Sequence, residues 1–329
     1  FSACIEAEAS PSLIFQLPKT LFDNSNPEVL AAIATNPDVC FSISEIKLGK
    51  DPVASAKPYI SEDGQEFSHI FDYLLDGKKT MRAVWTPGIT EDMMNRTANI
   101  DYKELMENCK KMDETFKDAD YVHVTSEGGT DVLVPIKGRK LLFDNGDFSK
   151  PGTGGNIPAG EVFISPLVPN ENVKGIEGVI VYDGSMTFSD GASILETPIV
   201  CKLVEGHVTD IDGGNEAKRL LKTITEAENR AVSMEKEQKL PEGMGAIYKK
   251  NARNIGELGI GLNPAARITG NMLEDEKAYH TCHFAIGQNY DNDAPCLIHL
   301  DGVVKNPTIE IIYSNGEKKI ILEKGFIKL

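Results

Sequence analysis

The stretch Tyr121-Val-His-Val-Thr125-Ser-Glu-Gly-Gly-Thr130-Asp-Val-Leu-Val-Pro-Ile136 decides the fold class of the larger part of this chain. Tyr121 to Thr125 alternates apolar and polar residues like a strand, and Thr130 to Ile136 indicates a second strand. Further short strands are predicted at Glu161 to Ile164 and Gly178 to Tyr182, separated by Gly, Pro, Asn and Asp. A β-rich domain is therefore expected from residue 121 onward.

Two features complete this domain. One amphipathic helix is predicted from Asn215 to Met234. The chain then closes with Thr308 to Tyr313, a Ser-Asn-Gly-Glu turn and Lys318 to Leu322, which indicates a hairpin. We expect a C-terminal, β-rich α+β domain over residues 121–329.

The first 120 residues instead alternate short apolar runs with helical patterns, beginning at Leu13-Ile14-Phe15. Asn26-Pro27 is a helix start signal before Glu28 to Ala34, and residues 64–76 carry apolar side chains at helical spacing from Phe67 to Leu75. Met81 to Trp85 resembles a strand, and Asp101 to Ala119 has one charged and one apolar face. An N-terminal α/β domain, with a small parallel or mixed sheet flanked by helices, is predicted over residues 1–120.

Composition narrows the possible partners and the compartment. The 329 residues contain 34 Lys plus Arg and 50 Asp plus Glu, and the formal charge of -16 repels nucleic acid phosphates and anionic membranes. We therefore expect neither nucleic acid nor a membrane as a partner. The six cysteines are scattered without a CxxC pair, and the chain has neither an apolar run of about 18 residues nor a signal-peptide pattern. A cytoplasmic protein with reduced thiols is the expectation.

The densest chemical signal begins with Gly256-Glu-Leu-Gly-Ile-Gly-Leu-Asn-Pro264. Three glycines surround Glu257, and glycine allows close approaches that a larger residue would block. The segment matches neither a P-loop, because no Gly-Lys-Ser/Thr follows, nor the spacing of a dinucleotide site. Glu257 is therefore a candidate site carboxylate rather than part of a phosphate loop.

Three more positions join it as candidate metal ligands. His283 stands in an apolar, strand-like stretch, where a neutral imidazole keeps a lone pair for a metal, although a hydrogen-bonded core histidine has the same pattern. His299 and Asp301 lie two residues apart, so a strand would direct both to one face, although such pairs also occur by chance. Glu161 follows a glycine turn, a place where a solvated strand-end glutamate is the alternative.

These motifs resemble the aminopeptidase T, or M29, metallopeptidase family over roughly residues 81–304. Asn156-Ile-Pro-Ala-Gly-Glu161-Val-Phe, Glu257-Leu-Gly with Asn263-Pro264, Asp275-Glu-Lys277 with Thr281 and His283, and His299-x-Asp301 are similar to the family's motifs. Thr130-Asp131 and Lys137-Gly-Arg139 are similar to the strand that leads into its catalytic domain.

The resemblance implies a metal-dependent aminopeptidase that acts on a peptide substrate and assembles as a homodimer. It implies two divalent ions, zinc, cobalt or manganese, and a metal-bridged water as the nucleophile. The implied ligands are Glu161, Glu257, His283, His299 and Asp301, and the implied catalytic residues are Glu161 and Tyr290. Tyr290 would donate a hydrogen bond to the oxyanion, although a half-buried loop tyrosine is the plain alternative.

The sequence also departs from the family pattern, and two other functions stay open. His280 replaces a glycine, and Asp291-Asn-Asp-Ala-Pro-Cys296 replaces a serine-rich stretch. A shorter branch is similar to ring-opening dioxygenases of dihydroxypyridine, in which one non-haem iron would use His299, Asp301 and one further ligand. A metal-binding scaffold without activity is the third possibility. His283 and Glu257 together favour the hydrolase over the dioxygenase.

Overall fold

The computed structural model describes residues 2–16, 24–43 and 48–329 and divides the chain into two compact units. Unit 1 comprises Phe1–Ile89 with Gly146–Ile157, and unit 2 comprises Thr90–Asn145 with Pro158–Leu329. The boundary expected at residue 120 falls inside unit 2, within the strand Ala119–Thr125. Residues 17–23 and 44–47 of the expected N-terminal domain lie outside the described residues.

Unit 1 is built on a small parallel sheet, as the α/β pattern predicts. Its three strands are ordered β1 (Val39–Ser42), β4 (Arg82–Trp85) and β8 (Gly154–Asn156). A short hairpin of β2 (Tyr59–Ile60) and β3 (Glu66–Phe67) stands apart from this sheet. The helical segments are α1 (Ser2–Glu6), α2 (Pro27–Ala34), α3 (Pro52–Ala56), α4 (Ile70–Asp72) and the π-helix η1 (Tyr73–Gly77).

The apolar positions of the predicted helices form the core of unit 1. Val29 and Ile33 of α2 pack with Ile70, Phe71, Leu74 and Leu75, and with Met81 and Ala83 around β4. The helix expected from residue 64 begins only at Ile70, because Phe67 lies in the β3 hairpin instead. Leu13-Ile14-Phe15 forms no regular element and is exposed, so this apolar run does not mark a strand.

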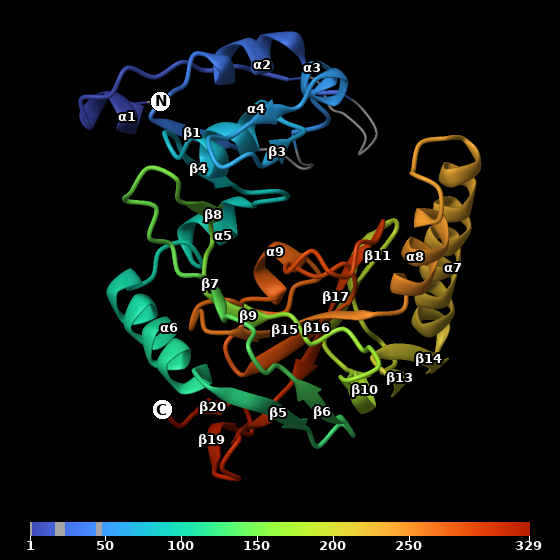
Figure 1. Ribbon diagram of the computed structural model, residues 1–329. Coiled ribbons are helices and arrows are strands. Elements are labelled where there is room, and N and C mark those ends of the chain that lie inside the picture. Colours follow the sequence, from blue (N-terminus) through green and yellow to red (C-terminus); the bar gives the residue numbers. More distant parts are fainter. Residues whose placement is uncertain (1, 17–23, 44–47) are drawn as a thin grey trace. The chain divides into compact units, whose positions relative to one another are not determined.

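Unit 2 consists of two large sheets whose strand pairs are all antiparallel (Figure 1). The eight-stranded sheet has the order β14 (His207–Asp212), β13 (Ile199–Val204), β10 (Glu177–Tyr182), β6 (Asp131–Pro135), β5 (Ala119–Thr125), β18 (Thr308–Tyr313), β19 (Lys318–Glu323), β20 (Phe326–Ile327). The seven-stranded sheet has the order β12 (Gly191–Ile194), β11 (Ser185–Phe188), β17 (His299–Lys305), β16 (Thr281–Gly287), β15 (Ile255–Gly261), β9 (Glu161–Ile164), β7 (Leu142–Asp144).

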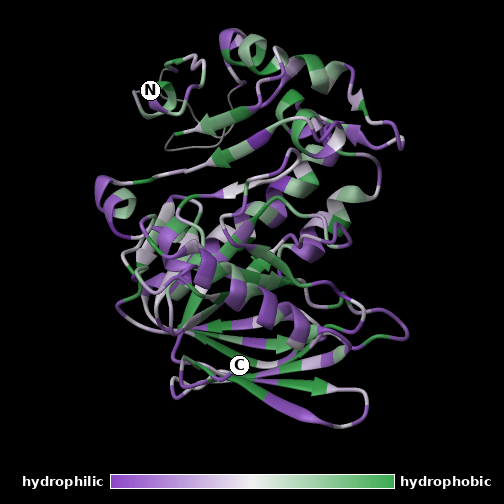
Figure 2. Cartoon of the chain, turned by 90° about the vertical axis from the view of Figure 1, so that its left-hand side faces the viewer, coloured by the Kyte–Doolittle hydropathy of each residue, from purple (hydrophilic) through white to green (hydrophobic). Residues whose placement is uncertain are grey.

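Helices surround these sheets. They are α5 (Glu91–Asn95), α6 (Tyr102–Phe116), α7 (Asn215–Lys236), α8 (Met244–Asn251) and α9 (Met272–Asp275). The strands of unit 2 carry bands of apolar and polar residues (Figure 2), as expected when one side of a strand faces a core. Along β13 the burial alternates at every residue, from buried Ile199 to exposed Val204. The mixed α/β and α+β fold class is confirmed.

The two sheets of unit 2 pack against each other through β10 and β17. A Cβ atom at Gly302 of β17 would lie 2.4 Å from the Tyr182 ring of β10, so a glycine is needed at this contact. Gly302 and its neighbours on that side of the seven-stranded sheet therefore face the core. The side chains on the opposite side of the same sheet point away from this contact.

Two further properties of the described part of the chain concern membrane-spanning helices and disulfide bonds. No helix there is both long and apolar enough to cross a lipid bilayer. The six cysteines are all free.

Candidate metal centre

The five predicted metal ligands lie on four neighbouring strands of the seven-stranded sheet. Glu161 starts β9, Glu257 is on β15, His283 is on β16, and His299 and Asp301 are on β17. The register pairs Glu257 with Ala285, Ala285 with Asp301, and Gly261 with Glu161. Because paired residues share a side of a sheet, all five side chains project from the side that does not face Gly302. The convergence expected from the sequence is present.

A β-bulge sets the direction of Glu257. Ile255 pairs with Ile286 and Glu257 pairs with Ala285, so β15 has one residue more than β16 at this point. The extra residue is Gly256, whose added Cβ would lie 2.2 Å from the Gln288 carbonyl oxygen. A bulge reverses the alternation of the strand, and here it turns Glu257 toward the ligands rather than toward the core.

Gly259 makes room for His283. A Cβ atom there would lie 2.0 Å from His283 Nε2, so the imidazole ring lies directly over the glycine backbone. This is the close approach that the glycines around Glu257 predict. Ala285 is the other small residue on this side of the sheet, opposite Glu257 and Asp301.

The ligand atoms form two groups of three that share Glu257. In the open group, His299 Nε2 lies 2.9 Å from Glu257 Oε2 and 3.2 Å from Asp301 Oδ1. Its His299 and Asp301 side chains are 27% and 13% exposed, so a small molecule can reach them.

The closed group contains Glu161, Glu257 and His283, all buried. His283 Nε2 lies 3.3 Å from Glu257 Oε1 and 3.5 Å from Glu161 Oε2. Lys277 adds a positive charge to this group, because its ammonium lies 3.1 Å from Glu161 Oε1 and also contacts Glu276. The Lys277 side chain has no exposed surface, so the chain itself supplies a buried cation here.

The open group has the features of a metal site. His299 Nδ1 donates to the Gln288 carbonyl at 2.8 Å, and its Nε2 faces the carboxylates of Glu257 and Asp301, so a cation bound there would replace the Nε2 proton that these carboxylates favour. Asp301 Oδ1 is buried yet forms no hydrogen bond with any described residue. Buried oxygens without donors are rare unless an ion or water satisfies them. Two carboxylates and one imidazole thus fit a divalent cation.

The closed group fits a metal less well. His283 Nδ1 is buried without a hydrogen-bond partner among the described residues, whereas metal-binding histidines nearly always donate from their second nitrogen. Burial raises the pKa of the Glu161 carboxyl to about 8, although Lys277 opposes this effect. Burial also acts on Asp301, but the charge of His299 outweighs it and lowers the pKa to about 2. Asp301 is therefore an anion at neutral pH, and Lys277 supplies the opposing charge that lets the buried Glu161 ionise.

Tyr290, the predicted oxyanion donor, lies at the edge of the open group. Its ring centroid is 5.4 Å from that of His299 and 4.8 Å from that of Phe163, and 49% of the residue is exposed. Phe163 follows Glu161 by two residues on β9 and so shares its side of the sheet. Tyr290 is thus beside the ligands, and its catalytic role stays a prediction.

Sequence reasoning missed the importance of Lys277 and Glu276. Both were visible only as part of a motif, because a buried lysine looks the same in sequence as a solvated one. Their position depends on the acidic residues just before them. Glu274 binds Arg96 at 2.6 Å, and Asp275 accepts hydrogen bonds from the backbone of Thr269 and Gly270. These contacts fix the turn that delivers Lys277 to Glu161.

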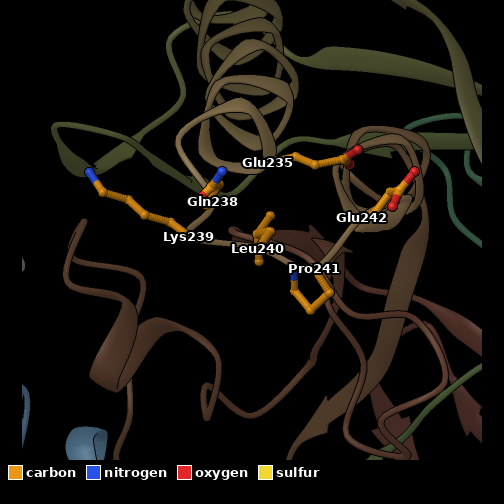
Figure 3. A pocket seen from close by; sticks show the side chains of 6 residues that line it. All are labelled: Glu235, Gln238, Lys239, Leu240, Pro241 and Glu242. Carbon is orange, nitrogen blue, oxygen red and sulfur yellow. The ribbon is translucent and has the colours of Figure 1, made fainter.

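A separate hollow lies at the turn between α7 and α8 (Figure 3). It contains none of the predicted site residues. Its lining is one residue of the last turn of α7 and five residues of the connection to α8: Glu235, Gln238, Lys239, Leu240, Pro241 and Glu242. It contains no set of groups suited to catalysis.

Known proteins resemble this chain both in sequence pattern and in three-dimensional structure. The sequence model of the family described as "NicX: 2,5-dihydroxypyridine 5,6-dioxygenase" matches residues 76–310. The structure of 2,5-dihydroxypyridine dioxygenase from Pseudomonas putida KT2440 is similar with a TM-score of 0.65 and 18% identity, over 99% of this chain and 86% of that one. Wild-type AmpT from Thermus thermophilus is similar with a TM-score of 0.56 and 14% identity, over 92% and 79% of the two chains. No curated protein sequence matches.

The predicted metallo-aminopeptidase, and with it the hydrolase and protease assignment, is wrong. The likeness to AmpT is one of fold, and the family match points to an oxidoreductase. The physical reason is that carboxylate and imidazole ligands serve hydrolytic and oxygen-dependent metal centres alike, so Glu257 and His283 could not separate the two. With 235 of its 329 residues matched, from 76 to 310, the chain belongs to the 2,5-dihydroxypyridine 5,6-dioxygenase family, NicX.

Proposed function

We propose that this protein is a ring-cleaving dioxygenase of the dihydroxypyridine type that uses a single non-haem ferrous ion. The observation that supports this function most is the match of residues 76–310 to the NicX family. The open group adds to it, because imidazole and carboxylate are the ligand types that non-haem iron oxygenases use and the group has room for other ligands.

The proposed ligands are Glu257, His299 and Asp301. When bound there, ferrous iron would supply the electron exchange with dioxygen that ring cleavage requires. His299 is oriented for this role by the Gln288 carbonyl, and Asp301 provides an anionic oxygen without a competing donor. The set differs from the more usual pair of histidines with one carboxylate, since Glu257 stands where a second imidazole would be.

The closed group has a different role in this proposal. Lys277 holds Glu161, and Glu161 and Glu257 both lie within 3.5 Å of His283 Nε2. This chain of groups leads from the buried lysine to the ligand Glu257. His283 Nε2 lies between the two carboxylates and so connects Glu161 to the proposed ligand Glu257.

Oxygen uptake tests this function. Protein loaded anaerobically with ferrous iron and mixed with 2,5-dihydroxypyridine and air is expected to consume one dioxygen for each ring lost, measured with an oxygen electrode and by the ring's ultraviolet absorbance. Zinc-loaded protein is the control and should consume none, because zinc has no redox chemistry.

Two single-histidine substitutions, one at the site and one away from it, provide the matched variants. His299→Ala is expected to abolish uptake, whereas His280→Ala should retain it, because His280 contacts the Gly325 carbonyl rather than the centre. Iron-loaded wild-type protein that leaves both the ring and the oxygen untouched would rule out the proposed function.

A further inference from the structure

The loop between β16 and β17 carries two aspartates that have no role in the ligand groups. It runs from Gln288 to Ile298, and its two ends are joined by a hydrogen bond from the Gln288 amide to the Ile298 carbonyl. Gln288 also orients His299, and Tyr290 lies two residues further on. The shape of this loop therefore bears on both side chains.

Arg139, which follows β6, holds the loop from outside. Its guanidinium lies 3.3 Å from Asp291 Oδ1 and 2.8 Å from Asp293 Oδ2, and it also donates to the Pro166 carbonyl. The Arg139 side chain is 11% exposed and those of Asp291 and Asp293 are 34% and 48% exposed, so one partly shielded guanidinium joins two aspartates at the surface. The contact joins the two sequence features that the ligand groups leave unexplained, Lys137-Gly-Arg139 and Asp291-Asn-Asp.

Contacts within the loop complete this arrangement. The side-chain amide of Asn289 donates to Asp293 Oδ1, and the backbone amide of Ala294 donates to Asn289 Oδ1 at 3.1 Å. The Tyr290 amide donates to Ser165 Oγ at 3.2 Å. Asp293 thus connects Arg139 to Asn289, the residue immediately before Tyr290.

The result is an aromatic rim beside the open group. Tyr290 lies between the rings of Phe163 and His299, with interplanar angles of 53° and 74°. Tilted and edge-on aromatic pairs of this kind favour flat ring partners, because the positive edge of one ring meets the negative face of another. About half of Tyr290 is free to contact a ligand.

We propose that Arg139 is a positioning residue for substrate selection: by binding Asp291 and Asp293 it keeps Tyr290 against Phe163 and His299, and this rim selects a planar ring. The inference rests on the proposed function for the identity of that ring. Its structural part, the fixing of the loop by Arg139, does not depend on the reaction.

Hydrogen exchange tests the structural part without substrate. Arg139→Gln is expected to speed amide exchange across residues 288–298, because the loop loses both ion pairs. Arg139→Lys should restore protection in part, since one ammonium can serve one aspartate. Arg219→Gln is the matched control, because Arg219 pairs with Asp190 away from this loop. Unchanged exchange in Arg139→Gln would overturn the fixing of the loop by Arg139.

Anaerobic titration of the metal-loaded protein with 2,5-dihydroxypyridine tests the selection of the ring. Arg139→Gln is expected to weaken binding about tenfold, with metal content unchanged, and Arg219→Gln should not weaken it. In a Tyr290→Ala background the same change should cost less than about twofold, because both residues act on one contact. A full tenfold loss in that background would show that Arg139 does not act through Tyr290.

The outcomes separate the inference from the function. If wild-type protein binds no ring while exchange still responds to Arg139→Gln, the proposed function falls, ring selection falls with it, and the fixing of the loop stands. If the ring binds and is cleaved, but Arg139→Gln binds it as tightly as wild type does, the function stands and the selection role is refuted.

Discussion

The closed and open groups share Glu257 yet differ in the source of positive charge. In the closed group the chain provides a cation, Lys277, which is fully buried beside Glu161. In the open group only the imidazole of His299 stands among the carboxylates, and an oxygen of Asp301 has no hydrogen bond. Lys277 compensates the closed group internally, whereas our proposal is that a metal ion from solution compensates the open group.

Replacement of Lys277 should give the largest effect. Lys277→Met leaves Glu161 and Glu276 buried without their cation, and breaking a buried ion pair on one side costs about 3–5 kcal/mol of unfolding free energy. Urea unfolding of the metal-free protein measures this. Lys318→Met, which removes an exposed pair with Glu310, is the control and should cost less than about 1 kcal/mol. Equal costs would mean that the closed group is not internally compensated.

The metal content of the Lys277→Met protein tests the same difference between the closed and open groups. Without the internal cation, the closed group is expected to accept a second divalent ion, so the ratio of zinc to chain should rise from one to two by elemental analysis. A zinc-to-chain ratio of two in the wild-type protein would show that the two groups do not differ in this way.

Removal of His299 should have the next largest effect. His299→Ala removes a ligand of the open group, and we expect metal affinity to fall by more than about 100-fold, since loss of second-shell partners alone costs 10–100-fold. Competition with a chelator measures the affinity. His283→Ala is the informative partner variant, because a similar loss there would place the ion in the closed group instead.

Gly259→Ala should give the smallest of these effects. The added methyl would collide with the His283 ring, and overpacking of this kind costs about 1–3 kcal/mol. Gly128→Ala is a milder control, with a nearest contact of 3.2 Å to a side-chain oxygen of Asp183. Thermal unfolding measures both. Because Gly259 touches His283 rather than His299, the affinity of the open group for metal should change little.

Much of the fold follows from local pattern. The strands expected at Glu161 to Ile164 and at Thr308 to Tyr313 have the observed bounds, and the predicted helix from Asn215 runs two residues beyond Met234. These elements obey simple periodicity because each buries one face. Phe67 and Leu13-Ile14-Phe15 were misassigned because an apolar residue in a hairpin or an exposed segment has the same local pattern as one in a helix or strand.

The sequence predicts that the side chains of the candidate site lie together but not how they divide into two groups, and their binding of metal stays a prediction. Glu161, Glu257, His283, His299 and Asp301 converge as expected, yet their separation into two groups depends on Lys277, whose burial is a tertiary property. The type of reaction was not predictable from these residues either, because the ligands do not fix whether the metal is redox-active. Assembly as a homodimer stays a prediction.

The Gly256 bulge makes the proposed metal site depend on the number of residues in the strand as well as on their type. One residue removed near Gly256 would restore regular alternation and send the Glu257 carboxylate to the opposite side of the sheet, with every ligand codon intact. Short deletions in this strand could therefore produce relatives that keep the fold and the motifs yet bind no ion, which an inventory of ligand residues alone would miss.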